Sequence, residues 1–188
     1  MQEDIAPFFP KIVLIGMSGA GKSTVGKMLA KRLQMPFLDL DKIIEEQYKV
    51  GIPRFLQKYG EKIFRQCEYQ MLLQTLEKDC FVLATGGGSP CFFNAMQHIK
   101  QKTLSIYIYM PVSALFHRIT KSNRPRPLVF DPLPEKTRQN IKHLLQVRDP
   151  IYCQAHEIVN GENGQGEQVV SRIITLLTNK IEIIKQNN

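Results

Sequence analysis

Short apolar runs alternate along the chain with longer segments in which apolar residues recur every three or four positions. The short runs predict buried strands, and the periodic segments predict helices. The predicted strands are 11–15, 36–41, 80–85, 103–110 and 157–160. The predicted helices are 25–33, 42–49, 54–78, 112–120, 135–147 and 169–184. Strands that alternate with helices indicate a parallel sheet covered on both faces.

Residues 121–134 contain four prolines, so we expect an exposed segment without a continuous helix. Such a segment is either a functional lid or an ordinary surface loop. A second loop, the glycine-rich turn at 161–166, precedes the last helix. A chain of 188 residues supports one well-buried core, which predicts a single domain over residues 1–188.

The loop after the first strand carries the clearest chemistry. Residues Gly16 to Thr24 read GMSGAGKST and fit the pattern G-x-x-x-x-G-K-[ST] between a strand and a helix. In such a loop, glycines let backbone amides turn toward phosphates, and the helix directs its positive end at them. Lys22 is able to reach the β- and γ-phosphate oxygens, and Ser23 offers a hydroxyl to Mg²⁺. The loop therefore predicts a nucleoside triphosphate site.

Two aspartates, Asp39 and Asp41, end the second predicted strand. Ligands bind at this end of parallel strands. One carboxylate near Ser23 would support Mg²⁺, and the other would accept a proton from the phosphoryl acceptor. The alternative is that both are turn or helix-capping residues. A phosphorylated acceptor close to Asp41 would be repelled by about 1 to 4 kcal/mol, so a hydroxyl acceptor fits better.

Three further features point to a small acid. The third predicted strand runs into Gly86, Gly87 and Gly88, which let a ligand approach backbone amides, although glycine-rich turns also occur without a ligand. Arg65 lies on the long predicted helix, and Arg148 begins the sequence RDPIY. Each arginine alone is compatible with a surface ion pair. If both converge beside Asp41, they would bind a carboxylate bidentately and select a hydroxy acid.

Composition excludes several classes of function. The formal net charge of +8 suits anionic ligands, but the arginines form no dense basic stripe interleaved with aromatics, so we expect no nucleic-acid partner. The sequence has no apolar run of about 18 residues. It also begins without the basic-then-apolar order of a secretory signal, so we expect no membrane association and a cytoplasmic location. The four scattered cysteines predict reduced, mostly buried thiols.

Six motifs in a fixed order resemble the shikimate kinase family, over about residues 11–177. They are the loop 16–24, FLDLD at 37–41, GEKIFRQCE at 60–68, GGG at 86–88, RPL at 126–128 and RDPIY at 148–152. Each motif is short, but the ordered combination is specific.

This resemblance implies the nucleoside monophosphate kinase branch of the P-loop proteins. The implied fold has three α/β layers with a five-stranded parallel sheet, a substrate-binding helical insertion at about 42–72 and a lid at about 121–134. The implied reaction is ATP-dependent phosphorylation of the shikimate 3-hydroxyl, which yields shikimate 3-phosphate and ADP in the biosynthesis of chorismate and aromatic amino acids. Mg²⁺ would be the cofactor, and we expect a monomer.

The resemblance also implies roles for single residues. Ser23 would ligate Mg²⁺, with Asp39 acting through water. Asp41 would hold the acceptor hydroxyl and act as base. Shikimate would be bound by Arg65, Gly87 and Arg148, with Phe64 and Glu68 shaping the site. The residues that would bind ATP are Gly19, Ala20, Gly21, Lys22, Ser23, Thr24, Arg126 and Gln165.

The residues with an implied catalytic role are Lys22, Asp41 and Arg126. Arg126 in the lid would stabilise charge on the ATP phosphates, as an arginine finger does, although Arg124 is a close competitor. Arg118 and the turn near Gln165 would flank the adenine, but Gln165 stands where some relatives have arginine.

Two rival functions remain at this point. A gluconate kinase is also a P-loop enzyme acting on a hydroxy acid, but the motifs at 37–41 and 60–68 argue against it. A non-catalytic nucleotide-binding regulator is disfavoured by the presence of Lys22, Asp41 and Arg126.

Overall fold

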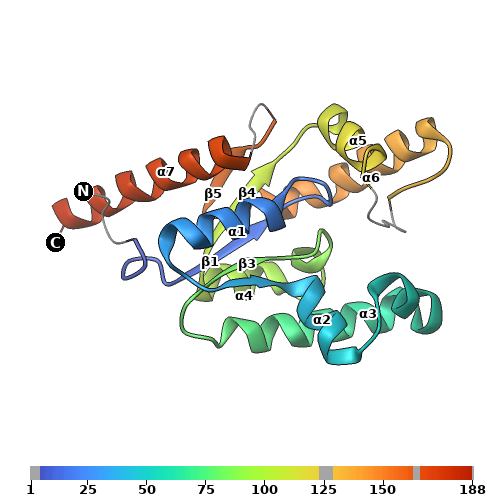
Figure 1. The fold of residues 1–188 in the computed structure, drawn as a ribbon, viewed down its shortest axis with the longest axis horizontal. Coiled ribbons are helices and arrows are strands. Elements are labelled where there is room, and N and C mark those ends of the chain that lie inside the picture. The colour runs from blue at the N-terminus through green and yellow to red at the C-terminus, as the bar shows by residue number, and fades with distance from the viewer. Residues whose placement is uncertain (1–4, 123–128, 163–165, 188) are drawn as a thin grey trace.

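The core of the protein is a single parallel sheet. The computed structural model describes residues 5–122, 129–162 and 166–187 (Figure 1). The strands are β1 (Lys11–Ile15), β2 (Phe37–Asp39), β3 (Phe81–Ala84), β4 (Leu104–Tyr109) and β5 (Glu157–Asn160). They lie in the order β2-β3-β1-β4-β5, and every neighbouring pair is parallel. The predicted five-stranded parallel sheet is confirmed.

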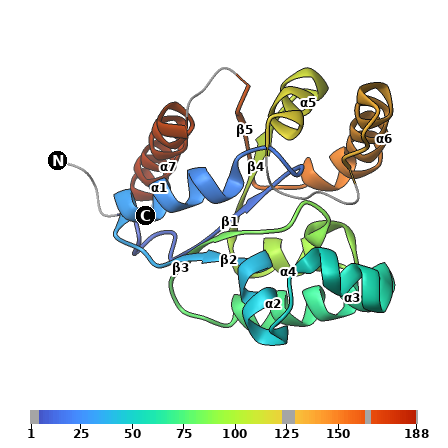
Figure 2. The same cartoon turned by 45° about the vertical axis from the view of Figure 1, so that its right-hand side comes forward.

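Helices cover both faces of this sheet. The helices are α1 (Lys22–Leu33), α2 (Leu40–Tyr48), α3 (Ile52–Leu76), α4 (Ala95–Lys102), α5 (Val112–Thr120), α6 (Pro134–Tyr152) and α7 (Gly166–Gln186), with a 3₁₀ turn η1 (Ser89–Cys91). Helices α1 and α7 pack together on one face, and α3 and α4 lie on the other (Figures 1 and 2). Helix α2 packs on α3, and α5 packs on α6. The result is the predicted three-layer α/β fold.

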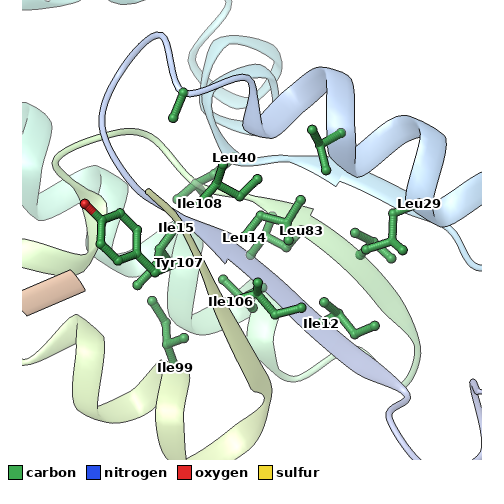
Figure 3. Packing of buried hydrophobic residues seen from close by; sticks show 14 of the residues in the cluster. Ile12, Leu14, Ile15, Leu29, Leu40, Leu83, Ile99, Ile106, Tyr107 and Ile108 are labelled. Carbon is green, nitrogen blue, oxygen red and sulfur yellow. The ribbon is translucent and has the colours of Figure 1, made fainter. Parts of the chain in front are cut away.

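The central strand explains why the strand signals are so clear. Strand β1 lies between β3 and β4, and its residues from Ile12 to Ile15 are fully buried. In Figure 3, Ile12 and Leu14 lie among Leu83 of β3 and Ile106 of β4. Because helices cover both faces, such strands appear in the sequence as uninterrupted apolar runs. The phosphate loop is therefore attached to a central strand that is buried on both faces.

Several predicted boundaries are wrong in ways that affect the site. The second strand ends at Asp39, and helix α2 already begins at Leu40, so Asp41 lies in the first helical turn. Leu40, the first residue of this helix, is fully buried. Helix α3 contains a kink at Gly60, where φ is 77°.

The other corrections concern segments that sequence reasoning cut short or missed. Helix α6 continues past the predicted end at residue 147, through Pro150 to Tyr152. The elements η1 and α4 were not predicted. The cysteines are free, but they are not mostly buried, because Cys153 is exposed and the others are half-buried. None of the helices in the described ranges is long and apolar enough to cross a membrane.

Candidate active site

The carboxyl ends of β1, β2 and β3 open into a cavity of about 800 Å³. Its walls come from the phosphate loop, α2, α3, the turn after β3, α5 and α6. The predicted site residues that line it are Gly19, Gly21, Lys22, Ser23, Thr24, Asp39, Asp41, Arg65, Gly87 and Arg148. Ala20 is buried beside them without lining the cavity. The residues Arg124, Arg126 and Gln165 lie outside the described residues.

Glycines determine the backbone conformation of the phosphate loop, and a lysine side chain hydrogen-bonds across it. Gly16 has a φ of 136°, and a Cβ atom there would lie 2.7 Å from the carbonyl oxygen of Ile108, so only glycine fits. Lys22 begins α1 and is buried, and its Nζ donates to the carbonyl oxygens of Gly16 at 2.7 Å and Met17 at 2.9 Å. The loop thus holds an ammonium group at the N-terminus of a helix, which is an arrangement suited to phosphate.

Arg118 adds a second cation near the loop. This residue lies on α5 and lines the cavity, and its Nη1 lies 3.4 Å from the carbonyl oxygen of Ala20. A Cβ atom on Gly21 would lie 3.2 Å from the same Nη1. The guanidinium group therefore lies against the phosphate loop.

Asp39 and Ser23 both line the cavity and carry oxygen atoms suited to a metal. Asp39 occupies the N-cap position of α2, but its side chain makes no capping hydrogen bond, which argues against the capping interpretation. Mg²⁺ prefers hard oxygen ligands and retains several waters, so a hydroxyl and one carboxylate fit its requirements. No cluster of three or more His, Cys, Asp or Glu side chains suited to a metal occurs among the described residues. Ser23 and Asp39 are thus the candidates for a water-rich Mg²⁺ site.

Asp41 is the carboxylate most perturbed by its surroundings. Its side chain is half-buried by accessible surface, facing the cavity, and protein surrounds the carboxyl group on its other sides. Desolvation by burial, followed by the negative charges of Glu68 and Asp39, raises the pKa of Asp41 to about 6, with Lys22 opposing the shift. A carboxylate with such a pKa is ionised at neutral pH and is a stronger base than an ordinary aspartate.

Arg65 is fixed by carboxylates on two sides. Its Nε and Nη2 donate to Glu61 Oε1 at 3.1 and 2.9 Å, and its Nη1 donates to Glu68 Oε2 at 2.7 Å. Glu68 is itself held by the hydroxyl of Ser89, which donates to Oε1 at 2.5 Å. A Cβ atom on Gly88 would lie 2.6 Å from the guanidinium group, so glycine allows the backbone to cover its face. Arg65 therefore presents its remaining donors in a fixed orientation.

Arg148 reaches the same cavity from the opposite side of the fold. It lies on α6 and is 7% exposed, compared with 5% for Arg65. This burial contradicts the alternative that the two arginines are surface ion-pairing residues. No carboxylate among the described residues forms an ion pair with Arg148. A buried guanidinium group without a counter-ion is costly, so the site suits an anionic ligand.

A family model described as "SKI: Shikimate kinase" matches residues 18–178. The chain belongs to the shikimate kinase family. The shikimate kinase of Phocaeicola vulgatus is 31% identical over 171 residues, covering 91% of this chain and 98% of that protein. The shikimate kinase of Cereibacter sphaeroides is 34% identical over 174 residues, covering 93% of this chain and 85% of that protein.

Solved shikimate kinase structures also resemble this chain. Shikimate kinase from Acinetobacter baumannii in complex with shikimate has a TM-score of 0.86 and 34% identity, covering 93% of this chain and 96% of that one. The enzyme from Bacteroides thetaiotaomicron has a TM-score of 0.83 and 33% identity, with 89% and 97% covered. A gluconokinase from Sinorhizobium meliloti, at 16% identity and a TM-score of 0.60, shares the fold alone. As a shikimate kinase family member, the chain is an ATP-dependent kinase.

Sequence reasoning missed three partners in this shikimate kinase site. Glu61 and Ser89 hold the Arg65 network, and the hydroxyl of Tyr152 donates to the carbonyl oxygen of Gly87. Glu61 stands four residues before Arg65, a spacing that places both on one helix face and could have revealed the pair. Ser89 carries no such local signal, because chain folding brings it to Glu68.

Proposed function

We propose that this chain transfers the γ-phosphoryl group of ATP to the 3-hydroxyl of shikimate, yielding shikimate 3-phosphate and ADP for aromatic amino-acid biosynthesis. The observation that carries the proposal is the buried Arg148, which has no carboxylate partner among the described residues and lines the same cavity as Asp41 and Lys22. A hydroxy acid supplies the missing carboxylate at one end and the acceptor hydroxyl at the other. The related enzyme from A. baumannii, described as a complex with shikimate, supports this choice of acid.

The carboxylate of the substrate would be bound by two arginines with different surroundings. Arg65 already faces Glu61 and Glu68, so its charge is locally compensated and its main contribution is directed hydrogen bonding. Arg148 supplies the uncompensated positive charge. Gly87 lines the same cavity and lies against the phosphate loop. Because it has no side chain, the substrate is able to approach its backbone closely.

Asp41 would act on the hydroxyl group of the acceptor. As the hydroxyl oxygen attacks the γ-phosphorus, its proton passes to the Asp41 carboxylate, and the bond between the γ-phosphorus and the β-phosphate oxygen breaks to release ADP. The raised pKa of Asp41, about 6, makes this transfer more favourable than for an ordinary aspartate while leaving the group ionised at neutral pH. Lys22 would stabilise the negative charge on the β- and γ-phosphates.

Ser23 and Asp39 would hold Mg²⁺, Asp39 through a water molecule. When bound, the ion neutralises charge on the β- and γ-phosphates. The roles of Arg126 at the phosphates and Gln165 at the adenine stay predictions, as do the lid at 121–134, the substrate-binding insertion at 42–72, the single-domain boundary, the cytoplasmic location and the monomeric state.

An ADP-release assay with shikimate, gluconate and AMP as acceptors tests the proposal. We expect rapid ADP release with shikimate and only background hydrolysis with the other two. Gluconate lacks the ring that places a hydroxyl and a carboxylate at a fixed separation, and AMP brings a phosphate toward Asp41. Robust activity on gluconate alone would refute the proposal, and ATP binding without turnover on any acceptor would favour a regulator.

A further inference from the structure

The hydroxyl of Tyr152 lies where three parts of the site meet. Tyr152 ends helix α6 and is fully buried. Its hydroxyl donates to the carbonyl oxygen of Gly87 and lies 3.7 Å from the sulfur of Met17. One side-chain oxygen therefore touches both the turn after β3 and the phosphate loop. Neither the phosphate-binding nor the proton-transfer role assigned above uses this group.

The two segments that Tyr152 touches are packed tightly against each other. A Cβ atom on Gly87 would lie 2.8 Å from the backbone nitrogen of Ser18, so the turn and the loop approach at backbone distance. The carbonyl oxygen of Met17 in turn accepts a hydrogen bond from Lys22 Nζ at 2.9 Å. A displacement of Gly87 would therefore move the acceptor side of the cavity relative to the phosphate loop, which Lys22 holds independently.

Helix geometry connects the same hydroxyl to the carboxylate-binding arginine. Tyr152 follows Arg148 by four residues, so both lie on the inner face of α6. Pro150, between them, removes one backbone donor from this helical turn, which leaves side-chain contacts to hold it. The ring of Tyr152 packs on that of Tyr107, with centroids 5.1 Å apart. Burial raises the pKa of Tyr152 well above that of a free tyrosine, so the hydroxyl stays protonated and donates.

We infer that Tyr152 is a positioning residue, whose hydroxyl fixes Gly87 relative to Arg148 and thereby sets where the carboxylate end of the substrate lies with respect to the phosphate loop. The inference rests on the proposed function. The aromatic ring alone would suffice for core packing, whereas the hydroxyl is required for the contact with Gly87. Removing only the oxygen separates the two contributions.

Tyr152→Phe removes this oxygen and keeps the ring, and Tyr107→Phe is the matched control. Tyr107 is also buried, and its hydroxyl donates to Asp149 Oδ1 at 2.7 Å on the same helix. We expect Tyr152→Phe to raise the KM for shikimate about five- to tenfold, with the KM for ATP within about twofold, because an unpaired buried carbonyl is free to shift. Tyr107→Phe should lower the Tm while leaving the KM for shikimate near the wild-type value. Calorimetric titration of shikimate without nucleotide should give the same ranking of Kd values.

The outcomes separate this inference from the proposed function. A normal KM for shikimate in Tyr152→Phe, whatever its Tm, would show that the hydroxyl serves packing alone and would overturn the inference. Equal increases in the KM values for shikimate and ATP would also overturn it, because they indicate general loosening. If wild-type protein releases no ADP in response to shikimate, the proposed function fails and the inference fails with it.

Discussion

The two ends of the cavity are built in different ways. The phosphate end is one contiguous stretch, residues 16–24, in which backbone geometry and Lys22 provide the binding groups. The acceptor end is assembled from α2, α3, the turn after β3 and α6, which contribute Asp41, Arg65, Gly87 and Arg148. Recognition of phosphate is thus a property of local chain geometry, whereas recognition of the acid depends on distant segments and the balance of charges between them.

The two ends also differ in what they cost the free protein. The acceptor end gathers Asp41, Glu68, Arg65 and Arg148 around one cavity. The raised pKa of Asp41 and the buried Arg148, which has no carboxylate partner among the described residues, are both costly to the free protein. The phosphate end depends instead on positive-φ backbone conformations, which Gly16, Gly19 and Gly21 adopt without strain. Replacing Asp41 should therefore lower activity while raising stability, whereas substitutions of loop glycines should lower both.

The largest expected effect is that of Asp41→Asn. Loss of the base should lower kcat by about 10²- to 10⁴-fold. The Tm should rise, because burial and the negative charge of Glu68 disfavour the Asp41 carboxylate but not a neutral amide. At about 1.4 kcal/mol per pKa unit, the free energy of unfolding should increase by at most about 3 kcal/mol. The Kd for ATP should stay within about twofold. Glu46→Gln, on the exposed side of α2, is the control and should change none of these. An unchanged kcat in Asp41→Asn would exclude its role as base.

Arg148→Lys tests the acceptor end without changing the formal charge. We expect the KM for shikimate to rise about 10- to 100-fold, because lysine cannot reproduce the bidentate fork, while the KM for ATP stays near normal. Arg138→Lys, on the exposed surface of the same helix, is the matched control. Arg65→Lys should show the same change in KM and also a lower Tm, since Glu61 and Glu68 lose their shared partner. If both variants keep a normal KM for shikimate, the carboxylate clamp is wrong.

Gly16→Ala tests the phosphate end. Its φ of 136° and the 2.7 Å approach to Ile108 leave no room for a methyl group, so we expect a lower Tm and a KM for ATP raised about tenfold. The Kd for shikimate should change little if the two ends are built independently. Gly51→Ala is the control, because its φ is −66° and a Cβ atom would meet nothing closer than 3.7 Å. A larger loss of shikimate affinity than of ATP affinity would contradict the separation.

The smallest expected effect near neutral pH is a pH dependence set by Asp41. Its pKa is raised from 3.8 to about 6, so kcat/KM for shikimate should fall to about half near pH 6 and about tenfold for each further pH unit below that. The contribution of Asp41 to stability should change in the opposite direction, because its carboxylate binds a proton more readily in the folded protein than in the unfolded chain. As the pH rises from about 4 to 6, Asp41 therefore destabilises the fold progressively. A profile of kcat/KM that is flat from pH 5 to pH 8 would argue against an ionised Asp41 as base.

Sequence patterns predicted the five strands because buried parallel strands are continuous apolar runs. They missed α4, whose buried residues Ala95, Met96 and Ile99 form only a short stripe within eight residues. They ended α6 too early because Pro150 is a local helix breaker, whereas the buried Arg148 and Tyr152 keep the chain helical beyond it. Local preference was overridden by tertiary packing.

The same distinction applies to the site. The phosphate loop and its geometry were predictable because every binding group lies within nine residues. Asp41 was placed on a strand although it lies on a helix, because a buried apolar residue such as Leu40 suits a strand and the first turn of a helix equally well. The contact of Tyr152 with Gly87 and the approach of Ser89 to Glu68 join segments far apart in the sequence, and no periodicity encodes them. The resemblance to a family placed Arg65, Gly87 and Arg148 in one site, but it connected neither Tyr152 nor Ser89 to them.

The most direct test of the account is the identity of the product formed from ATP and shikimate, determined by phosphorus and proton NMR. A hydroxyl held by Asp41 with the carboxylate held by Arg65 and Arg148 predicts one phosphate monoester, on the 3-hydroxyl, formed in equal amount with ADP. Release of inorganic phosphate without an ester, or an ester on another hydroxyl, would contradict the proposed orientation of the acid.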